Sequence, residues 1–435
     1  MVASALAELC AGTKSTQSDN RETQSTLSSG SADINAELID ENPPAPSRDE
    51  ATASQPPIQS LYQITPLRSL RSQRLDDAAI RRGPSDLISR KMLSIRDAEV
   101  LVNNYLQRTD HYLYGIASEY ASLENLRQAS PLLLTAILTV AALQSPDGQQ
   151  QYRVCYPKLR RLIADFLFSA VVILEDLRGL CIACFWLSDI SWSILGLAIR
   201  RAVKLKLPKY FSMAVEYLKP ELSPSVSDQL ARRLIDGVRL WYLLYVRDQH
   251  LAILYGRRSI LRDGEEIQNW MLCLAVWRGS ITDIRILSQV ALLQILRSIP
   301  EIFGQDSKRR VPTLLKSQLD AFNQQLDLWV THWLGISQNH LIIGTYPSKA
   351  ITLHHHFSKL LVSSHVFRGI GPDPSQDPLP TKSQDLAAVA INSAKSVVEL
   401  TVTDPDLIDA YIGIPHSYHT MIAFACSFLM KVATK

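Results

Sequence analysis

Apolar side chains recur at helical spacing from about residue 85 to the end of the chain, and this pattern constrains the fold more than any other feature. Residues three and four apart lie on one face of a helix, and few segments alternate polar and apolar residues for long enough to form strands. Glycine accounts for only 17 of the 435 residues, which argues against glycine-rich nucleotide folds and turn-dense sandwiches. The predicted fold class is all-α: a large multi-helix domain preceded by a disordered N-terminal tail.

The N-terminal part of the chain has a different composition. Residues 12–30 are rich in Ser, Thr and Gln, and residues 42–57 are rich in proline. Such a segment cannot bury enough apolar surface to offset its conformational entropy. Residues 1–60 are therefore expected to form a disordered Ser/Thr/Gln/Pro-rich tail, residues 61–89 a basic linker, and residues 90–435 the helical domain. The basic residues of the linker include Arg68, Arg71, Arg74, Arg81 and Arg82.

Several helices can be placed from their caps and apolar stripes. Ser130 precedes Pro131, a pair typical of an N-cap followed by the first helical position. Residues 180–207 are apolar on nearly all sides, which predicts a helix, or a close pair of helices, in the middle of the domain. Further helices are expected over residues 131–143, 229–255, 281–302, 314–333, 351–367, 385–402 and 418–432.

The cysteines and histidines do not form a recognisable metal motif. Cys181 and Cys184 have the spacing of half a zinc site, but a structural zinc needs four ligands and the sequence has no second Cys-x-x-Cys pair. They are predicted to be buried core cysteines. His354, His355 and His356 are consecutive, and consecutive helical residues point about 100° apart. Solvated or partly packed histidines are therefore expected, with no metal, cofactor or catalytic residue assigned in this chain.

Charge and hydropathy constrain the partners. A net charge of +3 is close to balanced, so no global basic field demands a nucleic-acid partner. Residues 128–146 are uncharged but fall short of the roughly 20 apolar residues that span a bilayer. Residues 411–430 are also uncharged but contain Pro415, His416 and His419. Both stretches are interpreted as core helices, no membrane partner is expected, and the sparse cysteines fit a cytosolic or nuclear protein.

One carboxylate lies on an apolar helical stripe. Asp248 follows Trp241 by seven residues and precedes Ala252 by four. Because an unpaired buried carboxylate costs several kcal/mol, the favoured interpretation is an ion pair that fixes the exit of this helix. The alternative is a polar anchor in a ligand or regulatory pocket. The nearest cations in the sequence are Arg247, Arg257 and Arg258, the last two just after Gly256, where the helix is expected to end.

Three blocks of sequence, in order and spacing, resemble one known family. Residues 239–248 (Arg-Leu-Trp-Tyr-Leu-Leu-Tyr-Val-Arg-Asp) and 255–260 (Tyr-Gly-Arg-Arg-Ser-Ile) resemble the signature of the fungal transcription-factor regulatory domain. This domain is the middle-homology region of six-cysteine zinc-cluster regulators. Residues 191–202 resemble its Gly-x-Ala-x-Arg-x-Ala helix, and residues 126–133 its Ser-Pro-x-Leu helix. The residues that the resemblance implies as the regulatory-domain motif are Gly196, Ala198, Arg200, Arg239, Trp241, Asp248, Gly256 and Arg257.

The resemblance covers about residues 90–432 and is nearest to activators of secreted-protease genes, but it has departures. Arg258 stands where the family has proline, and residues 206–208 are Lys-Leu-Pro where it has Gly-Leu-His. The family's zinc cluster requires six cysteines, and Cys10 is the only cysteine before residue 150. Zinc is therefore expected only with an upstream cysteine cluster, and DNA contact only indirectly or through that missing N-terminal module. A truncated or mis-spliced gene model and a paralogue that acts through partners both remain open.

The resemblance implies a nuclear transcriptional regulator of fungal zinc-cluster type, an activator of secreted protease genes and not an enzyme. Its regulatory domain is expected to hold activity down or to sense a signal by shifting between two packings. It is expected to form a homodimer, or a heterodimer with related regulators, and residues 308–310 (Lys-Arg-Arg) are a weak candidate for nuclear import. One alternative is an all-α enzyme with a buried polar pocket near Asp248, which requires convergent titratable groups in an open cleft. The other is a scaffold without DNA binding that pairs with intact regulators.

Overall fold

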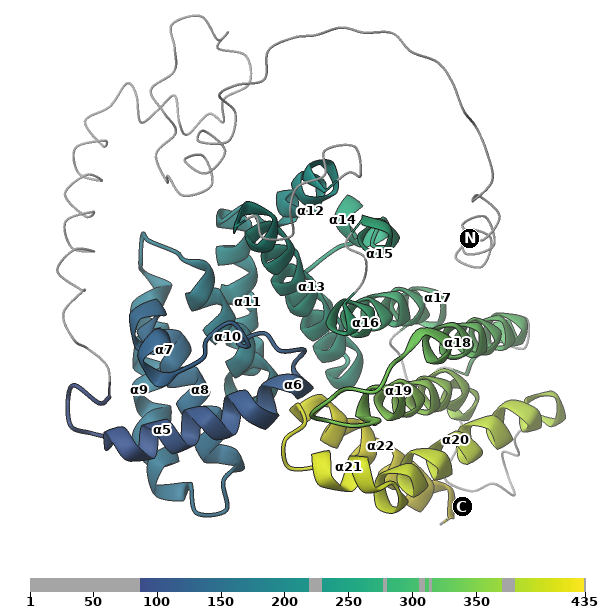
Figure 1. Cartoon of the computed structure of the whole chain (residues 1–435). Helices are drawn as coiled ribbons and strands as arrows, with labels where there is room; N and C mark the ends of the chain where they lie inside the picture. Colours follow the sequence, from purple (N-terminus) through teal and green to yellow (C-terminus); the bar gives the residue numbers. More distant parts are fainter. Residues whose placement is uncertain are drawn as a thin grey trace, which may run out of the picture. The chain divides into compact units, whose positions relative to one another are not determined.

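The computed structural model describes residues 87–218, 229–276, 280–304, 310–312, 315–369 and 380–433. Contacts divide the chain into two units, Met1–Ser85 with Phe168–Val172, and Asp86–Leu167 with Ile173–Lys435. The helices described below belong to the second unit (Figure 1). The tail expected over residues 1–60 and nearly all of the linker over 61–89 lie outside the described residues.

The all-α prediction is confirmed. Within the described residues the chain forms helices and no strand, and a single isolated bridge joins His340 to Gly344. The helices are α5 (Ile95–Asn104), η1 (Tyr105–Thr109), α6 (Asp110–Tyr112), α7 (Leu123–Ala129), α8 (Pro131–Gln144), α9 (Gln149–Leu167), α10 (Leu174–Trp186), α11 (Ser188–Lys204), α12 (Leu207–Tyr217), α13 (Gln229–Tyr255), α14 (Glu265–Gln268), α15 (Met271–Val276), α16 (Ile281–Arg297), α17 (Ile299–Phe303), α18 (Lys316–Ile336), α19 (Tyr346–Ser363), η3 (Ser364–Phe367), η4 (Thr381–Ser383), α20 (Gln384–Thr403), α21 (Pro405–Ala410) and α22 (His416–Ala433).

The predicted helix starts and stops agree with local chemistry. Ser130 caps α8, because its hydroxyl accepts hydrogen bonds from the amides of Leu132 and Leu133, and Pro131 takes the first position. At its C-terminus α13 ends before Gly256, which has a φ of 62°. The amide of Arg257 then donates to the Ala252 carbonyl at 3.0 Å, the bond that closes a Schellman motif.

The apolar stretch over residues 180–207 is a pair of helices rather than one. Helices α10 and α11 are separated by a break at Leu187, and the Ser191 hydroxyl donates to the Cys184 carbonyl at 2.7 Å across it. Helix α12 follows without a long loop, since Lys206 turns the chain with a φ of 58° and Pro208 is tolerated in the first helical turn. Most of the side chains of α10 are buried, as an all-round apolar helix requires.

Two groups of helices share the long helix α13. In the first group, α8 packs against α9 and α10, with α5 and α7 beside it. In the second group, α19, α20, α21 and α22 surround an apolar cluster that includes Leu353, Phe357 and Leu360, and α18 packs against α19. Helix α13 contacts α10, α11 and α12, and also α16 and α22 (Figure 1). It is therefore the element on which both groups are assembled.

Two stretches of the described chain, Ile281–Phe303 and Gln384–Thr403, have the length and hydropathy of a membrane-crossing helix. Core helices of water-soluble proteins meet the same criterion, so these stretches are weak indicators of a membrane. Neither coincides with the two uncharged stretches identified from the sequence, residues 128–146 and 411–430. The first of those contains α8, which is a core helix as predicted, because Leu132 to Ala142 are all buried. The second contains most of α22, which buries one face.

Candidate functional site

The part of the chain that carries the resemblance, α13 with the segment after it, forms a continuous polar network. Trp241, Tyr242, Tyr245, Asp248 and Gln249 follow one another at helical spacing and are all buried. Each of them hydrogen-bonds to residues between 260 and 273. We call residues 257–270 the strap, because the chain there runs back along α13 and is bound to it by these side chains.

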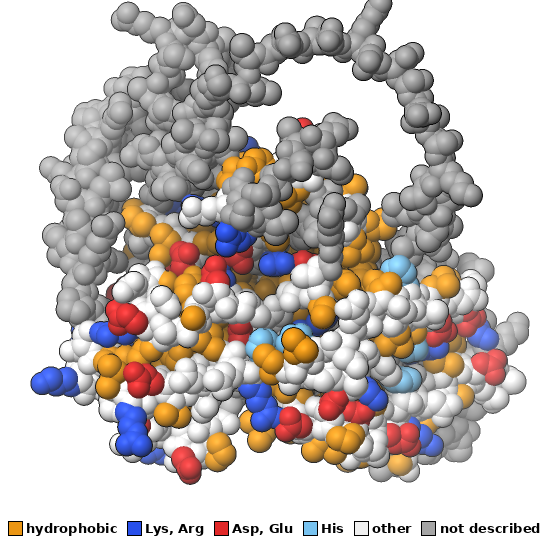
Figure 2. Space-filling model, in the orientation of Figure 1, with side chains coloured by type: hydrophobic (Ala, Val, Ile, Leu, Met, Phe, Trp, Pro, Cys, Tyr) orange, Lys and Arg blue, Asp and Glu red, His pale blue; other side chains and the backbone are white. Residues whose placement is uncertain are grey.

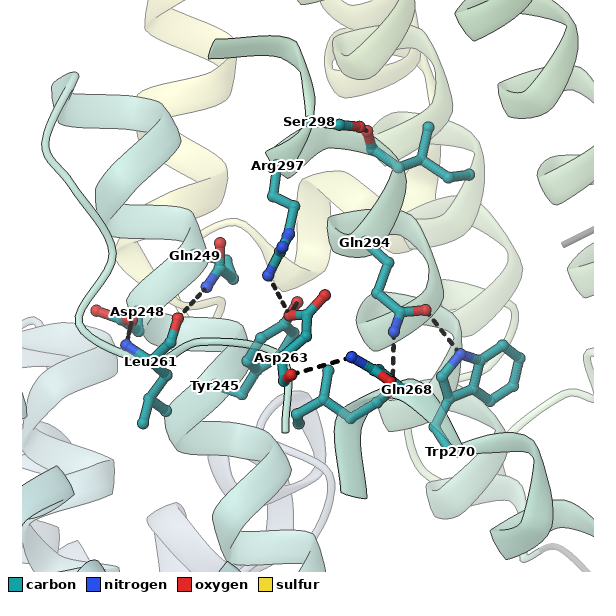
Figure 3. A network of polar contacts seen from close by, with 12 residues as sticks. Tyr245, Asp248, Gln249, Leu261, Asp263, Gln268, Trp270, Gln294, Arg297 and Ser298 are labelled. Atoms are coloured by element: carbon teal, nitrogen blue, oxygen red, sulfur yellow. Dashed lines mark hydrogen bonds and ion pairs between the residues drawn. The ribbon is translucent and has the colours of Figure 1, made fainter. Parts of the chain in front are cut away.

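The first part of the strap is held by two adjacent side chains of α13. The Oδ2 atom of Asp248 accepts hydrogen bonds from the backbone amides of Ile260, at 2.8 Å, and Leu261, at 2.7 Å. The Gln249 side chain donates to the Leu261 carbonyl at 3.4 Å. Figure 3 shows both side chains pointing from α13 to this turn of the strap.

The second part of the strap lies between α13 and α16. From α13, the Tyr245 hydroxyl donates to Asp263 at 3.1 Å and the Trp241 indole donates to Glu266 at 3.1 Å. From α16, Arg297 pairs with Asp263 at 2.6 Å (Figure 3). The Gln294 amide extends this contact, because it donates to the Ile267 carbonyl and accepts from the indole of Trp270. The strap thus joins the two helices by polar bonds along its length.

The predicted ion pair of Asp248 is wrong. Its hydrogen-bond partners are the two strap amides, and Oδ1 is buried with no partner among the described residues. Burial raises the pKa of this carboxyl to about 6, although the amides of Leu261 and Ile260 lower it. The candidate cations lie elsewhere: Arg257 and Arg258 are exposed, and Arg257 stacks on the Trp192 ring with 4.7 Å between the guanidinium carbon and the ring centroid. The helix exit is therefore fixed by backbone amides, which the sequence pattern does not reveal.

The blocks predicted from α11 and α13 meet at the strap. Gly196 of α11 is buried, and a Cβ placed on it would lie 3.8 Å from the Ile260 side chain and 3.4 Å from Arg200. Ala198 is fully buried, whereas Arg200 is exposed and donates to the Gly196 carbonyl at 3.2 Å. Gly196 and Asp248 therefore lie against the first part of the strap, Gly256 immediately precedes the strap, and Arg257 is its first residue.

Arg239 lies at a different place from the other motif residues. It forms a two-point ion pair with Asp283, with distances of 2.6 and 2.8 Å. Asp283 is also the third helical residue of α16, where it completes a capping box with Ser280. Arg239 thus ties the middle of α13 to the start of α16. Sequence reasoning missed this partner, although the Ser-x-x-Asp spacing at residues 280–283 is a helix-start signature.

The carboxylates of this network bond other groups of the protein. Within the described ranges no group of three His, Cys, Asp or Glu side chains is placed to hold a metal ion. Asp248 is fully buried under the strap, and Asp263, Glu266 and Asp283 each bond a side chain of α13. An open hollow on the described surface lies elsewhere, lined by Glu119, Tyr120, Asn125, Gln128, Ala129 and Glu175.

The cysteines and histidines weighed from the sequence are core or helix-surface residues. Cys181 and Cys184 are fully buried, as predicted, and burial raises the pKa of the Cys184 thiol to about 12. The expectation of solvated or partly packed histidines fits His355, which bonds Asp327 at 2.8 Å, but is wrong for His354. His354 is 1% exposed, because its position on α19 faces α13, where its ring stacks on that of His250 at 5.9 Å.

The fold and the network define an all-α domain in which a long helix binds its own following segment. The chain is similar to the transcriptional activator of proteases prtT of Emericella nidulans, with 33% identity over 388 residues. The match covers 87% of this chain and 56% of that protein, so the chain spans about half the length of the curated relative. No family model matches the chain, and no solved structure matches it.

Proposed function

We propose that this chain is a fungal transcriptional regulator that activates protease genes, acts in the nucleus and is not an enzyme. The observation that carries the proposal is its 33% identity, over 388 residues, to an activator of proteases. That match extends over 87% of the chain, so it includes helices outside the motif blocks as well. We further propose that the regulator is of the zinc-cluster type and controls secreted proteases. These two points rest on the resemblance of residues 191–202 and 239–260 to the fungal transcription-factor regulatory domain.

In this proposal residues 90–435 are the regulatory domain and the strap is its responsive element. Supporting this role, the strap connects α11, α13 and α16, so a change in the strap alters the contacts of three helices at once. Hydrogen bonds and an ion pair hold the strap, and several of its side chains, among them Ile260, are exposed, while Leu261, Ile267 and Trp270 are buried. Exposed segments held by polar bonds belong to the low-stability parts of a fold, from which regulatory elements are drawn.

We also propose that this chain reaches DNA through a homodimer or heterodimer partner, or through a zinc cluster outside these helices. Figure 2 supports this, since acidic and basic side chains are interspersed over the face shown instead of gathering into one basic surface among the described residues. Nucleic-acid readers present such a surface, because phosphate contacts supply much of the affinity.

The activator proposal is tested in a fungal strain from which the gene for this chain has been deleted. Growth on protein as nitrogen source should show a several-fold fall in secreted-protease transcripts and in extracellular protease activity, both restored by the wild-type chain. A strain complemented with Asp248→Ala should recover less than one complemented with Asp165→Ala, since Asp165 is an exposed residue of α9. Unchanged protease transcripts in the deletion strain would contradict the proposal.

The route to DNA is tested by a gel shift on a protease-gene promoter. The purified full chain is expected to give no sequence-specific shift, and addition of an intact zinc-cluster regulator should produce a complex that contains both proteins. A sequence-specific shift by the chain alone would contradict the indirect route while leaving the regulator proposal standing.

A further inference from the structure

Arg247 is a buried cation without a counter-anion in the described part of the chain. Its side chain lies in α13 and is 1% exposed. The Nε and Nη2 atoms donate to the Ser191 hydroxyl at 3.2 and 2.9 Å, and the Nη1 atom is buried with no partner. A guanidinium keeps its proton in proteins. Burying it unpaired costs several kcal/mol, so buried cations are normally found with an anion.

The groups around Arg247 do not supply that anion. The guanidinium lies 5.6 Å from the centroid of the Phe185 ring, and the titratable groups that affect its pKa are Cys184, Tyr255 and Cys181. Burial raises the pKa of both thiols, so neither is an anion at physiological pH, and burial lowers the pKa of Arg247 itself. The neighbouring carboxylate, Asp248, bonds the strap amides instead.

Two histidines within electrostatic reach of Arg247 are also not anions. His250, from the same helix, and His416, from α22, both have their pKa lowered by burial, and the Arg247 charge lowers it further. The Nδ1 atom of His250 is buried without a partner, as is Nε2 of its stacking neighbour His354. One turn of α13 therefore presents three buried side chains that each have an unsatisfied polar atom, Arg247, Asp248 and His250.

From this juxtaposition we propose that Arg247 is the anchor of a buried binding site for a small carboxylate, which accepts a hydrogen bond from the free Nη1 edge. A monoanion balances the single charge of the guanidinium, whereas a doubly charged phosphate would leave a net charge among Phe185 and the two thiols. The Ser191 hydroxyl holds the opposite edge of the guanidinium and so orients it.

The site stands independently of the proposed regulatory function and is tested without DNA. Thermal unfolding of the full chain is followed as acetate replaces chloride at constant ionic strength and pH. Because a ligand that binds only the folded state stabilises it in proportion to its occupancy, acetate should raise Tm saturably, by about 2 °C or more. Arg247→Met should abolish the rise, and Arg161→Met, which removes an exposed arginine of α9, should keep it.

An equal rise in wild type and Arg247→Met, or no rise in wild type, overturns the proposal. Since Arg247→Met removes a buried charge that has no described counter-charge, the variant is expected to fold. Should it not fold, saturation-transfer NMR of acetate on the wild-type chain decides the question. Transfer that saturates with acetate and is competed by propionate, another monocarboxylate, supports the site, and its absence overturns it.

Discussion

At the scale of single residues, Asp248 shows a buried carboxylate that is satisfied without a cation. Two amides of the strap donate to one of its oxygens, and the other oxygen has no described partner. Both amides lower the pKa of Asp248, but burial has the larger effect and raises it to about 6. Asp248 therefore orders the strap, although its buried position disfavours its own ionised form.

Replacing Asp248 by Ala should lower the free energy of unfolding by about 2–3 kcal/mol, because two amides of the strap lose their acceptor. Urea unfolding measures the loss, and amide hydrogen exchange should show faster exchange at Ile260 and Leu261. The control is Asp165→Ala, at an exposed position, which should change stability by less than about 0.5 kcal/mol. Equal stability of the two variants would show that the hydrogen bonds from Ile260 and Leu261 to Asp248 make no net contribution to the free energy of unfolding.

Two of the three motif arginines, Arg239 and Arg200, should respond differently to substitution. Asp283→Ala or Arg239→Ala breaks a two-point ion pair with a 3% exposed carboxylate, and the first change also removes a helix cap. Each should cost about 2–4 kcal/mol in urea unfolding. Arg200→Ala should cost less than about 0.5 kcal/mol, because Arg200 is exposed and bonds only its own helix among the described contacts. A similar cost for Arg200 and Arg239 would contradict this division.

The sequence predicted where polar residues lie better than it predicted their partners. Burial of Trp241 and Asp248 follows from spacing along one helix, and so does burial of the Cys181 and Cys184 pair. The partners of Asp248 are backbone amides, which every residue possesses, so no side-chain pattern marks them. Arg239 and Asp283 are 44 residues apart, and such a pair becomes visible only when α13 and α16 are packed together.

At the scale of helices, close approach of α8 and α10 depends on one glycine. A Cβ on Gly179 would lie 2.8 Å from the Cα atom of Leu133 and 2.9 Å from its amide nitrogen. Backbone atoms cannot move aside as a flexible side chain does, so the axes of the two helices would have to separate.

Gly179→Ala should therefore destabilise the fold by about 3 kcal/mol or more, with a lower yield of folded protein, while Gly256→Ala should cost only about 1–2 kcal/mol. Gly256 has a φ of 62°, yet a Cβ there meets nothing within 4 Å. Thermal unfolding of both variants measures the two costs: Gly179→Ala reports the close packing of α8 and α10, and Gly256→Ala reports the positive φ. The reverse order of stabilities would show that α8 and α10 adapt.

Helix positions were predictable to within a few residues wherever a cap or a breaker marks the end. The Ser130–Pro131 start and the Gly256 stop are of this kind. Helix α19 begins at Tyr346, before the predicted residue 351, because Pro347 lies in its first turn instead of preceding it. Pro157 is a different case, because it lies in the interior of α9, beyond the first turn, and does not end the helix. Proline marks a helix boundary only when packing does not override it.

At the scale of the whole molecule, the buried acid Asp110 should shape the dependence of stability on pH. It is fully buried, and both its oxygens accept the Ala117 amide, at 3.0 and 3.1 Å. Burial raises its pKa to about 7, against the opposing effects of the Ala117 amide, of Arg178 and of Tyr105. Because the folded state then holds a proton that the unfolded state has released, this group stabilises the fold at low pH and loses that contribution as pH rises from about 4 to 7.

Comparison with Asp110→Asn isolates this contribution from buried histidines such as His354, whose pKa is lowered to about 4 and whose effect has the opposite sign. The stability of wild type relative to Asp110→Asn should fall by about 2–3 kcal/mol between pH 5 and pH 8. Urea unfolding across this range measures the difference. A difference that stays constant with pH, or grows toward pH 8, would contradict the raised pKa.

The length of α13 has a mechanical consequence. Its 27 residues form a rod of about 40 Å that touches α10, α11, α12, α16 and α22. Arg247 and Asp248 are neighbours on this rod, yet one bonds Ser191 of α11 and the other bonds the strap. If α13 rotates so that Arg247 moves toward Ser191, Asp248 on the neighbouring face moves away from the strap amides. Occupancy of the Arg247 side would therefore change how closely Asp248 holds the strap.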